Sequence, residues 1–254
     1  MISPQQLKDL SKKYKINESI VAREFVQISF LKEFYRQNFT KDIFFKGGTA
    51  IRLLYQGQRF SEDLDFTVSL TPDVFEKKIT AFFSSLENQY PFSFKPRKTL
   101  AGKTYLLTAK VPYVKSMVFV KLDFSMRENV LEPKRAILET EYPIVMRGFV
   151  NALSKNEILA EKVRAVLKRK KNRDLYDLWL LQELGVKFNV ELIKKKLEFY
   201  EEDFDMKILK KRLELFSKEE FVLDLRPFVP INERGRLGEL FDFIIVYLKK
   251  KLVG

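Results

Sequence analysis

The sequence contains no cysteine and no histidine. Disulfide bonds, zinc sites with thiolate ligands and catalysis by a histidine base are therefore excluded. No stretch approaches the roughly 20 consecutive apolar residues that span a bilayer, and the opening MISPQQLKDLSKK lacks the apolar segment of a secretion signal. We therefore expect a cytoplasmic protein without membrane association. Any catalysis must use carboxylates, lysine, hydroxyl groups or a bound metal.

The chain is rich in positive charge. Its 47 Lys and Arg against 34 Asp and Glu give a net charge of +13, which indicates a polyanionic partner such as nucleic acid. From Lys155 to Arg173, eight basic residues stand against two acidic ones, a local net of +6. A lysine-rich solvated surface is the alternative interpretation.

The segment KGGTAIRLLY at residues 46–55 has the pattern of a phosphate site. Ile43, Phe44 and Phe45 predict a short buried strand, after which Gly47 and Gly48 allow a tight turn. We place Thr49 at the N-cap of the helix that follows. Free N–H groups and the helix dipole at such a terminus favour a bound phosphate. An ordinary turn is the alternative.

The segment SEDLDFTV that follows has the pattern of a metal site. It alternates charged and apolar residues with the period of a strand, so Asp63 and Asp65 share one face while Leu64 and Phe66 enter a core. No basic residue separates the two carboxylates in the sequence, so they repel unless a cation neutralises them. Mg²⁺ prefers such oxygen ligands together with substrate phosphates. A plain strand-end aspartate is the alternative for Asp65.

The two motifs in this order resemble the signature of the DNA polymerase β-like nucleotidyltransferases. The fuller string, KGGTAIRLLY followed by RFSEDLDF, resembles the AbiEii-like toxin family of that superfamily, whose members occur in toxin–antitoxin and abortive-infection systems. The interval from Thr49 to Asp63 is long for the superfamily and normal for this branch. The resemblance implies a nucleotide-binding set made of Lys46, Gly47, Gly48, Thr49, Arg52, Arg59 and Ser61.

The superfamily needs a third carboxylate on a later strand. In VFVKLDFSM, at residues 118–126, Asp123 shares a strand face with Lys121 and Ser125. The resemblance makes Asp123 a metal ligand beside Asp63 and Asp65. The alternative is an exposed strand aspartate paired with Lys121.

The segment SKNEILAEKVRAVLKRKKNRDLYDL, at residues 154–178, resembles a second conserved block of the family. Ser154 and Glu157 predict a helix N-terminus, and Lys162 lies off the apolar stripe of that helix. The resemblance implies that Lys162 contacts nucleotide phosphates, and that Asp174 or Asp177 orients the acceptor or the lysine. Without the family, Lys162 is a solvated helix lysine and Asp174 an N-cap.

These patterns together predict an α+β fold in two lobes. Residues 1–150 are expected to form a nucleotidyltransferase lobe with a mixed β-sheet flanked by helices, and residues 151–254 a helical lobe with accessory catalytic and RNA-contact residues. We expect helices from Ser3-Pro4, from Asn17 to Asn38 and from Thr71-Pro72. The expected later strands are residues 92–94, 104–113 and 118–125.

The function implied by the resemblance is transfer of a nucleoside monophosphate from an NTP to RNA, with tRNA favoured, by a toxin that uses Mg²⁺ or Mn²⁺. A cognate antitoxin is a possible partner. Two rivals stay open: transfer to a protein hydroxyl, on the antitoxin or on the enzyme's own Ser61, and a non-catalytic basic RNA-binding protein. Most of the 24 Phe fall on apolar stripes and predict core packing, which leaves Tyr55, Tyr105 and Tyr176 as candidate base contacts.

Overall fold

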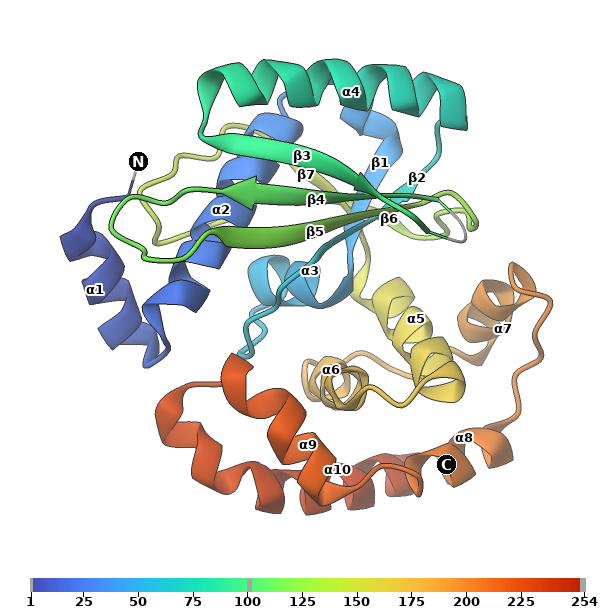
Figure 1. Ribbon diagram of the computed structural model, residues 1–254. Coiled ribbons are helices and arrows are strands. Elements are labelled where there is room, and N and C mark those ends of the chain that lie inside the picture. The colour runs from blue at the N-terminus through green and yellow to red at the C-terminus, as the bar shows by residue number, and fades with distance from the viewer. Residues whose placement is uncertain (1, 100–101, 252–254) are drawn as a thin grey trace. The chain divides into compact units, whose positions relative to one another are not determined.

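The computed structural model describes residues 2–99 and 102–251 (Figure 1). The chain divides into two compact units, Met1–Leu153 and Ser154–Gly254. The division lies a few residues beyond residue 150, because the segment Val150–Leu153 forms a strand that pairs with the sheet of the first unit.

The first unit is built on a mixed sheet whose strand order, within the described residues, is β3-β4-β5-β2-β1-β7-β6. The strands are β1 (Ile43–Lys46), β2 (Leu64–Val68), β3 (Phe92–Arg97), β4 (Lys103–Ala109), β5 (Val118–Ser125), β6 (Pro133–Ala136) and β7 (Val150–Leu153). Strand β2 runs parallel to β5 and antiparallel to β1, so the predicted mixed sheet is confirmed. Strand β4 ends at Ala109, earlier than predicted. Strands β6 and β7 were not predicted, because four residues are too short for an alternation to stand out.

Helices α1, α2 and α4 of the first unit begin where the sequence predicts them to begin. They are α1 (Pro4–Tyr14), α2 (Glu18–Phe34), the 3₁₀ helix η1 (Asn38–Asp42), α3 (Gly47–Leu54) and α4 (Pro72–Gln89). Ser3 forms a capping box with Gln6, and Thr71 precedes a proline in the first turn of α4. Helix α2 ends at Phe34 rather than at Asn38, because the chain turns there into η1.

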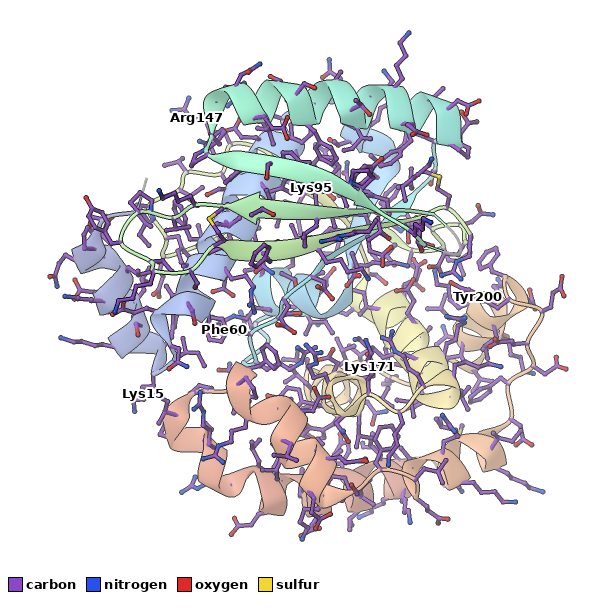
Figure 2. All side chains as sticks on the ribbon, in the orientation of Figure 1. Lys15, Phe60, Lys95, Arg147, Lys171 and Tyr200 are labelled. Carbon is purple, nitrogen blue, oxygen red and sulfur yellow. The ribbon has the colours of Figure 1, made fainter. Side chains whose placement is uncertain are left out.

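One face of the sheet is apolar and covered. Phe66 on β2 and Phe124 on β5 stack with ring centroids 4.9 Å apart, and rings from α2 (Phe34) and α4 (Phe75) pack against Phe124. Helix α4 lies along this face in Figure 1, and Figure 2 shows side chains filling the layer between them. Since side chains alternate along a strand, the residues next to Phe66 on β2 and next to Phe124 on β5 project from the opposite face of the sheet. That face carries Asp65 and Asp123.

All regular elements in the described residues of the second unit are helices, as predicted. Its elements are α5 (Lys155–Lys168), α6 (Asn172–Glu183), α7 (Val190–Glu198), α8 (Met206–Leu213), α9 (Lys218–Leu225), η2 (Arg226–Phe228), η3 (Ile231–Arg236) and α10 (Leu237–Lys251). Helix α5 packs against α6 and α7, and α9 packs against α6 and α10. The Ser154 hydroxyl accepts the Glu157 N–H as predicted, while the Glu157 carboxylate is buried and accepts from Lys196 Nζ at 2.8 Å.

Candidate active site

The turn from β1 into α3 lies directly against an aspartate of β2. Gly47 opens α3 with φ of +78°, a conformation that residues with a side chain rarely adopt. A Cβ at this position would lie 2.3 Å from Asp65 Oδ2, so the carboxylate occupies the space that a side chain would need. The phosphate motif and the metal motif of the sequence therefore meet here.

Gly48 makes room for two further residues of the predicted nucleotide site. A Cβ on Gly48 would lie 2.5 Å from Arg59 Nη2 and 3.0 Å from Ser61 Oγ. Arg59 is buried and donates from Nη1 to the Phe60 carbonyl at 3.0 Å, which fixes the guanidinium beside the start of α3. A positive charge, a hydroxyl and the N-terminus of a helix are thus brought together.

Thr49 has a different role from the one predicted. Helix α3 begins at Gly47 with Lys46 at its N-cap, so Thr49 is the third residue of the helix and its N-cap assignment is wrong. Gly47 and Gly48, and not Thr49, are therefore the first two residues of the helix. The Thr49 hydroxyl is buried and donates to the backbone carbonyl of Asp63, which ties α3 to the strand of the carboxylates. What Thr49 can offer a phosphate is its backbone N–H in the first helical turn.

The carboxylates converge through the pairing of two parallel strands. Asp65 on β2 is directly opposite Asp123 on β5, and neighbouring strands lie about 4.8 Å apart. Asp63 comes immediately before β2. Lys121 Nζ lies 2.7 Å from Asp123 Oδ2, so the alternative pairing considered for Asp123 is present. We call Asp63, Asp65, Asp123 and Lys121 the strand cluster.

The negative charges of Asp63, Asp65 and Asp123 all influence the pKa of Lys121. Burial by itself lowers the pKa of Lys121, but its hydrogen bond to Asp123 and the charges of Asp123, Asp65 and Asp63 raise that pKa above its ordinary value. Lys121, which is distant from Asp63 and Asp65 in the sequence, thus lies near enough to interact electrostatically with both. Strand pairing also sets Lys46 of β1 opposite Asp65.

The strand cluster fits a divalent cation bound together with a substrate. Among the described residues, no three carboxylates lie close enough to form a metal site from protein ligands alone. Mg²⁺ usually binds through one or two carboxylates and completes its shell with water and phosphate oxygens. Asp65 and Asp123 meet that requirement, and the ammonium of Lys121 already shows that this site attracts positive charge.

Two predicted nucleotide-binding residues are engaged elsewhere in the first unit. Lys46 forms an ion pair with the buried carboxylate of Glu128. Arg52 donates to Glu24 at 2.9 Å and stacks over the Phe60 ring, 4.0 Å from its centroid. Glu128 is a residue that the sequence did not reveal, because it follows β5 in an irregular segment without a pattern.

The second unit buries the lysine that was expected to be exposed. Lys162 is 8% exposed, and its Nζ lies 2.7 Å from Asp174 Oδ1 and 2.7 Å from Asp177 Oδ2. Arg169 Nε donates to Asp174 Oδ2 at 2.7 Å. We call Lys162, Arg169, Asp174 and Asp177 the helix cluster. Asp174 is not an N-cap, since it lies in the first turn of α6 behind Lys171.

Charge pairing controls the ionisation of the helix cluster. Burial alone would raise the pKa of Asp174, but Lys162 and Arg169 hold that pKa well below its usual range. Both candidate aspartates contact Lys162, so the geometry does not favour one of them over the other.

The basic stretch around α5 carries internal counter-charges. Lys168 pairs with Glu202 at 3.0 Å, Lys170 with Glu220 at 2.6 Å, and Arg173 with Asp224 at 3.3 Å. Sequence counting missed these partners because they lie far along the chain. The local excess of +6 therefore overstates the positive field of this surface. Tyr55, Tyr105 and Tyr176 are also buried and offer no ring to a base.

Comparisons with known proteins agree with this geometry. The family described as "Nucleotidyl transferase AbiEii toxin, Type IV TA system" matches residues 29–236. MenT4, a nucleotidyltransferase toxin of Mycobacterium tuberculosis, superposes with a TM-score of 0.67 at 16% identity, over 96% of this chain and 90% of that one. JHP933 of Helicobacter pylori gives a TM-score of 0.53 at 20% identity, over 93% and 96% of the two chains. No curated protein sequence matches the chain. In the described part of the chain, no helix is both long and apolar enough to cross a membrane.

Proposed function

The chain belongs to the AbiEii nucleotidyl transferase toxin family, and from that premise we propose that it transfers a nucleoside monophosphate from an NTP to RNA, with tRNA as the favoured acceptor. It is a nucleotidyltransferase toxin of a type IV toxin–antitoxin system. The family therefore favours an enzyme over the alternative of a non-catalytic RNA-binding protein. We propose Mg²⁺ as the metal, the cytoplasm as the location and a cognate antitoxin as a partner.

The observation that carries this proposal is the contact between the start of α3 and the strand cluster. Gly47 lies against the Asp65 carboxylate, and Asp65 lies opposite Asp123. A helix N-terminus binds phosphate oxygens, and paired carboxylates bind the metal that accompanies them. One nucleoside triphosphate can use both halves at once.

The residues of the first unit have distinct roles in this proposal. The N–H groups of Gly47, Gly48 and Thr49 bind oxygens of the triphosphate, and the Arg59 guanidinium beside Gly48 neutralises charge on the departing pyrophosphate. Asp65 and Asp123 would hold the metal together with oxygens of the substrate, and Asp63, the residue before β2, would add its charge beside them. The metal would stabilise the charge that develops on the phosphoryl oxygens. In the transfer itself, the acceptor hydroxyl oxygen forms a bond to the α-phosphorus while the bond to the β-phosphate bridge breaks. Asp123 accepts the hydroxyl proton.

The helix cluster contributes the positive charge of Lys162 to the proposed reaction. Family resemblance assigns Lys162 to the nucleotide phosphates and Asp174 and Asp177 to a supporting role, and the structure shows both aspartates in contact with the lysine. Two carboxylates, each 2.7 Å from the ammonium, restrict where the lysine side chain can lie. Such a preorganised cation suits phosphoryl transfer.

A transfer experiment tests the proposal directly. The full chain is incubated with Mg²⁺, each α-labelled NTP in turn, and a mixture of total RNA and purified tRNA. The label is expected on RNA for at least one NTP, and EDTA should abolish it. Label on the protein would instead identify a hydroxyl acceptor, for which Ser61 is placed beside Gly48. A Ser61→Ala variant separates these outcomes, because it removes self-labelling. Unchanged NTPs with every acceptor would contradict the proposal.

A further inference from the structure

The polar face of the sheet continues beyond the strand cluster onto β3 and β4. Strand pairing sets Asp123, Thr104 and Arg97 in one row across β5, β4 and β3. The next row along the sheet holds Lys121, Leu106 and Lys95, and the one after it holds Phe119, Thr108 and Ser93. We call these nine residues the outer face. All of them lie on the side of the sheet opposite to the phenylalanine core, because residues paired across strands share a face.

The outer face combines exposed positive charge with one exposed ring. Lys95, Arg97 and Lys121 are exposed, and Asp123 of the strand cluster is its acidic member. The Phe119 side chain is 50% exposed, whereas the paired phenylalanines on the covered face are fully buried. Core packing therefore does not explain an aromatic residue at position 119. Lys95 can be located on β3 in Figure 2.

We propose that the outer face binds the unpaired end of the acceptor RNA. Phe119 stacks on a base, and Lys95, Arg97 and Lys121 contact the phosphates that flank it. Exposed rings between cations on a sheet bind single strands in this way, since every base offers a flat face and the backbone is anionic. The inference rests on the proposed function, because it assigns a binding surface to the acceptor of that reaction.

Geometry supports this assignment over a separate binding site. Phe119 and Asp123 lie four residues apart on one strand, which corresponds to about 13 Å along the sheet. A base stacked on Phe119 would therefore lie a few nucleotides from the hydroxyl that reacts at the strand cluster. The outer face connects Phe119 with the strand cluster without interruption. Lys121, which lies between them, pairs with Asp123 and is within reach of a phosphate of the incoming strand.

The test compares two exposed aromatic residues of the first unit. Phe119→Ala is the test variant, and Phe149→Ala is the matched control, because Phe149 is 47% exposed and has Arg135 over its ring. Binding is measured by fluorescence anisotropy of a labelled single-stranded RNA that ends in the best acceptor sequence. Phe119→Ala should weaken binding by about tenfold or more, as expected for one lost base stack, while Phe149→Ala should bind like the wild type. Phe119→Trp should restore binding.

The kinetic arm separates this inference from the proposed function. With Phe119→Ala, the KM for RNA should rise by a similar factor while the KM for NTP stays unchanged. The double variant Lys95→Ala, Arg97→Ala should lower the dependence of binding on salt by about one unit of log–log slope per lost phosphate contact. If the wild type labels RNA but Phe119→Ala matches it in both binding and KM, the outer face is not the acceptor surface and the proposed function stands. If the wild type labels protein instead of RNA, both proposals fail.

Discussion

Each unit of the molecule holds a lysine against carboxylates, and the two clusters differ in burial. In the strand cluster, the side chains of Lys121 and Asp123 are 44% and 33% exposed. In the helix cluster, those of Lys162, Asp174 and Asp177 are 10%, 4% and 1% exposed. An exposed pair is screened by water and can exchange partners, whereas a buried pair must remain intact. The comparison shows that the charged groups of the first cluster are accessible to solvent, whereas those of the second are enclosed by their own unit.

Replacing the lysine of each cluster should give the largest difference between the two clusters, measured as the loss of unfolding free energy. Lys162→Met leaves two buried carboxylates with one cation fewer, so the free energy of unfolding should fall by about 3–5 kcal/mol. Lys121→Met breaks an exposed pair and should change it by about 1 kcal/mol or less. Urea denaturation of both variants measures the difference. Equal losses would remove the distinction between the clusters.

The contact between α3 and the strand cluster can be broken at Gly47. Gly47→Ala introduces a side chain at φ of +78° and also forces it onto Asp65, whereas Gly185→Ala has nearly the same φ of +80° and open space around its Cβ. Both should lose about 1 kcal/mol from backbone strain, and Gly47→Ala should lose about 1–3 kcal/mol more. Thermal melting gives the comparison. Similar melting temperatures for the two variants would show that Asp65 does not press on the start of α3.

Acid should act on the helix cluster through Asp174. Its folded-state pKa is lowered, so its charge stabilises the fold at pH values above about 4, the ordinary value of an unfolded aspartate, and that stabilisation disappears as the pH falls through the folded-state pKa. Unfolding free energies measured from pH 5 down to pH 2 should therefore fall less steeply in Asp174→Asn than in the wild type. Lys162→Met should flatten the same limb, because it removes the charge that lowers this pKa. A wild-type slope in both variants would contradict the assignment.

The smallest expected effect concerns competition between Lys121 and the metal. Because Lys121 neutralises Asp123, replacing it with Met should let a divalent cation bind up to about fivefold more tightly, the equivalent of one exposed ion pair. Calorimetric titration of the protein with Mn²⁺ measures this without turnover. Weaker binding in Lys121→Met would mean that the lysine supports the metal site instead of competing for it.

Local sequence patterns predicted most of the fold and the strand face that carries the candidate carboxylates. The alternation in SEDLDFTV and VFVKLDFSM is enough to place the carboxylates on one face, and caps such as Thr71-Pro72 locate helix starts. These signals work because they depend on neighbours two to four residues away. The same local view could not foresee the short strands β6 and β7.

Several misses depend on partners that are distant in sequence. Glu202 and Glu220 neutralise lysines that precede them by 34 and 50 residues, so a count of neighbouring charges cannot include them. Lys162 was expected to be solvated because it lies off the apolar stripe of α5. The carboxylates that bury it belong to α6. Phe119 was not singled out from the sequence. Its position along β5 places it on the same face as Asp123, and this alternation is the signal that could have identified it.

The most direct test of the account is nucleotidyl transfer by Asp65→Asn. The substitution keeps the shape of the side chain against Gly47 and removes the charge that binds the metal. We predict that transfer falls by at least about 10²- to 10³-fold while the melting temperature stays close to that of the wild type. Asp9→Asn, on the exposed surface of α1, serves as the control and should transfer at the wild-type rate. Wild-type transfer by Asp65→Asn in Mg²⁺ would contradict the assignment of the strand cluster as the catalytic centre.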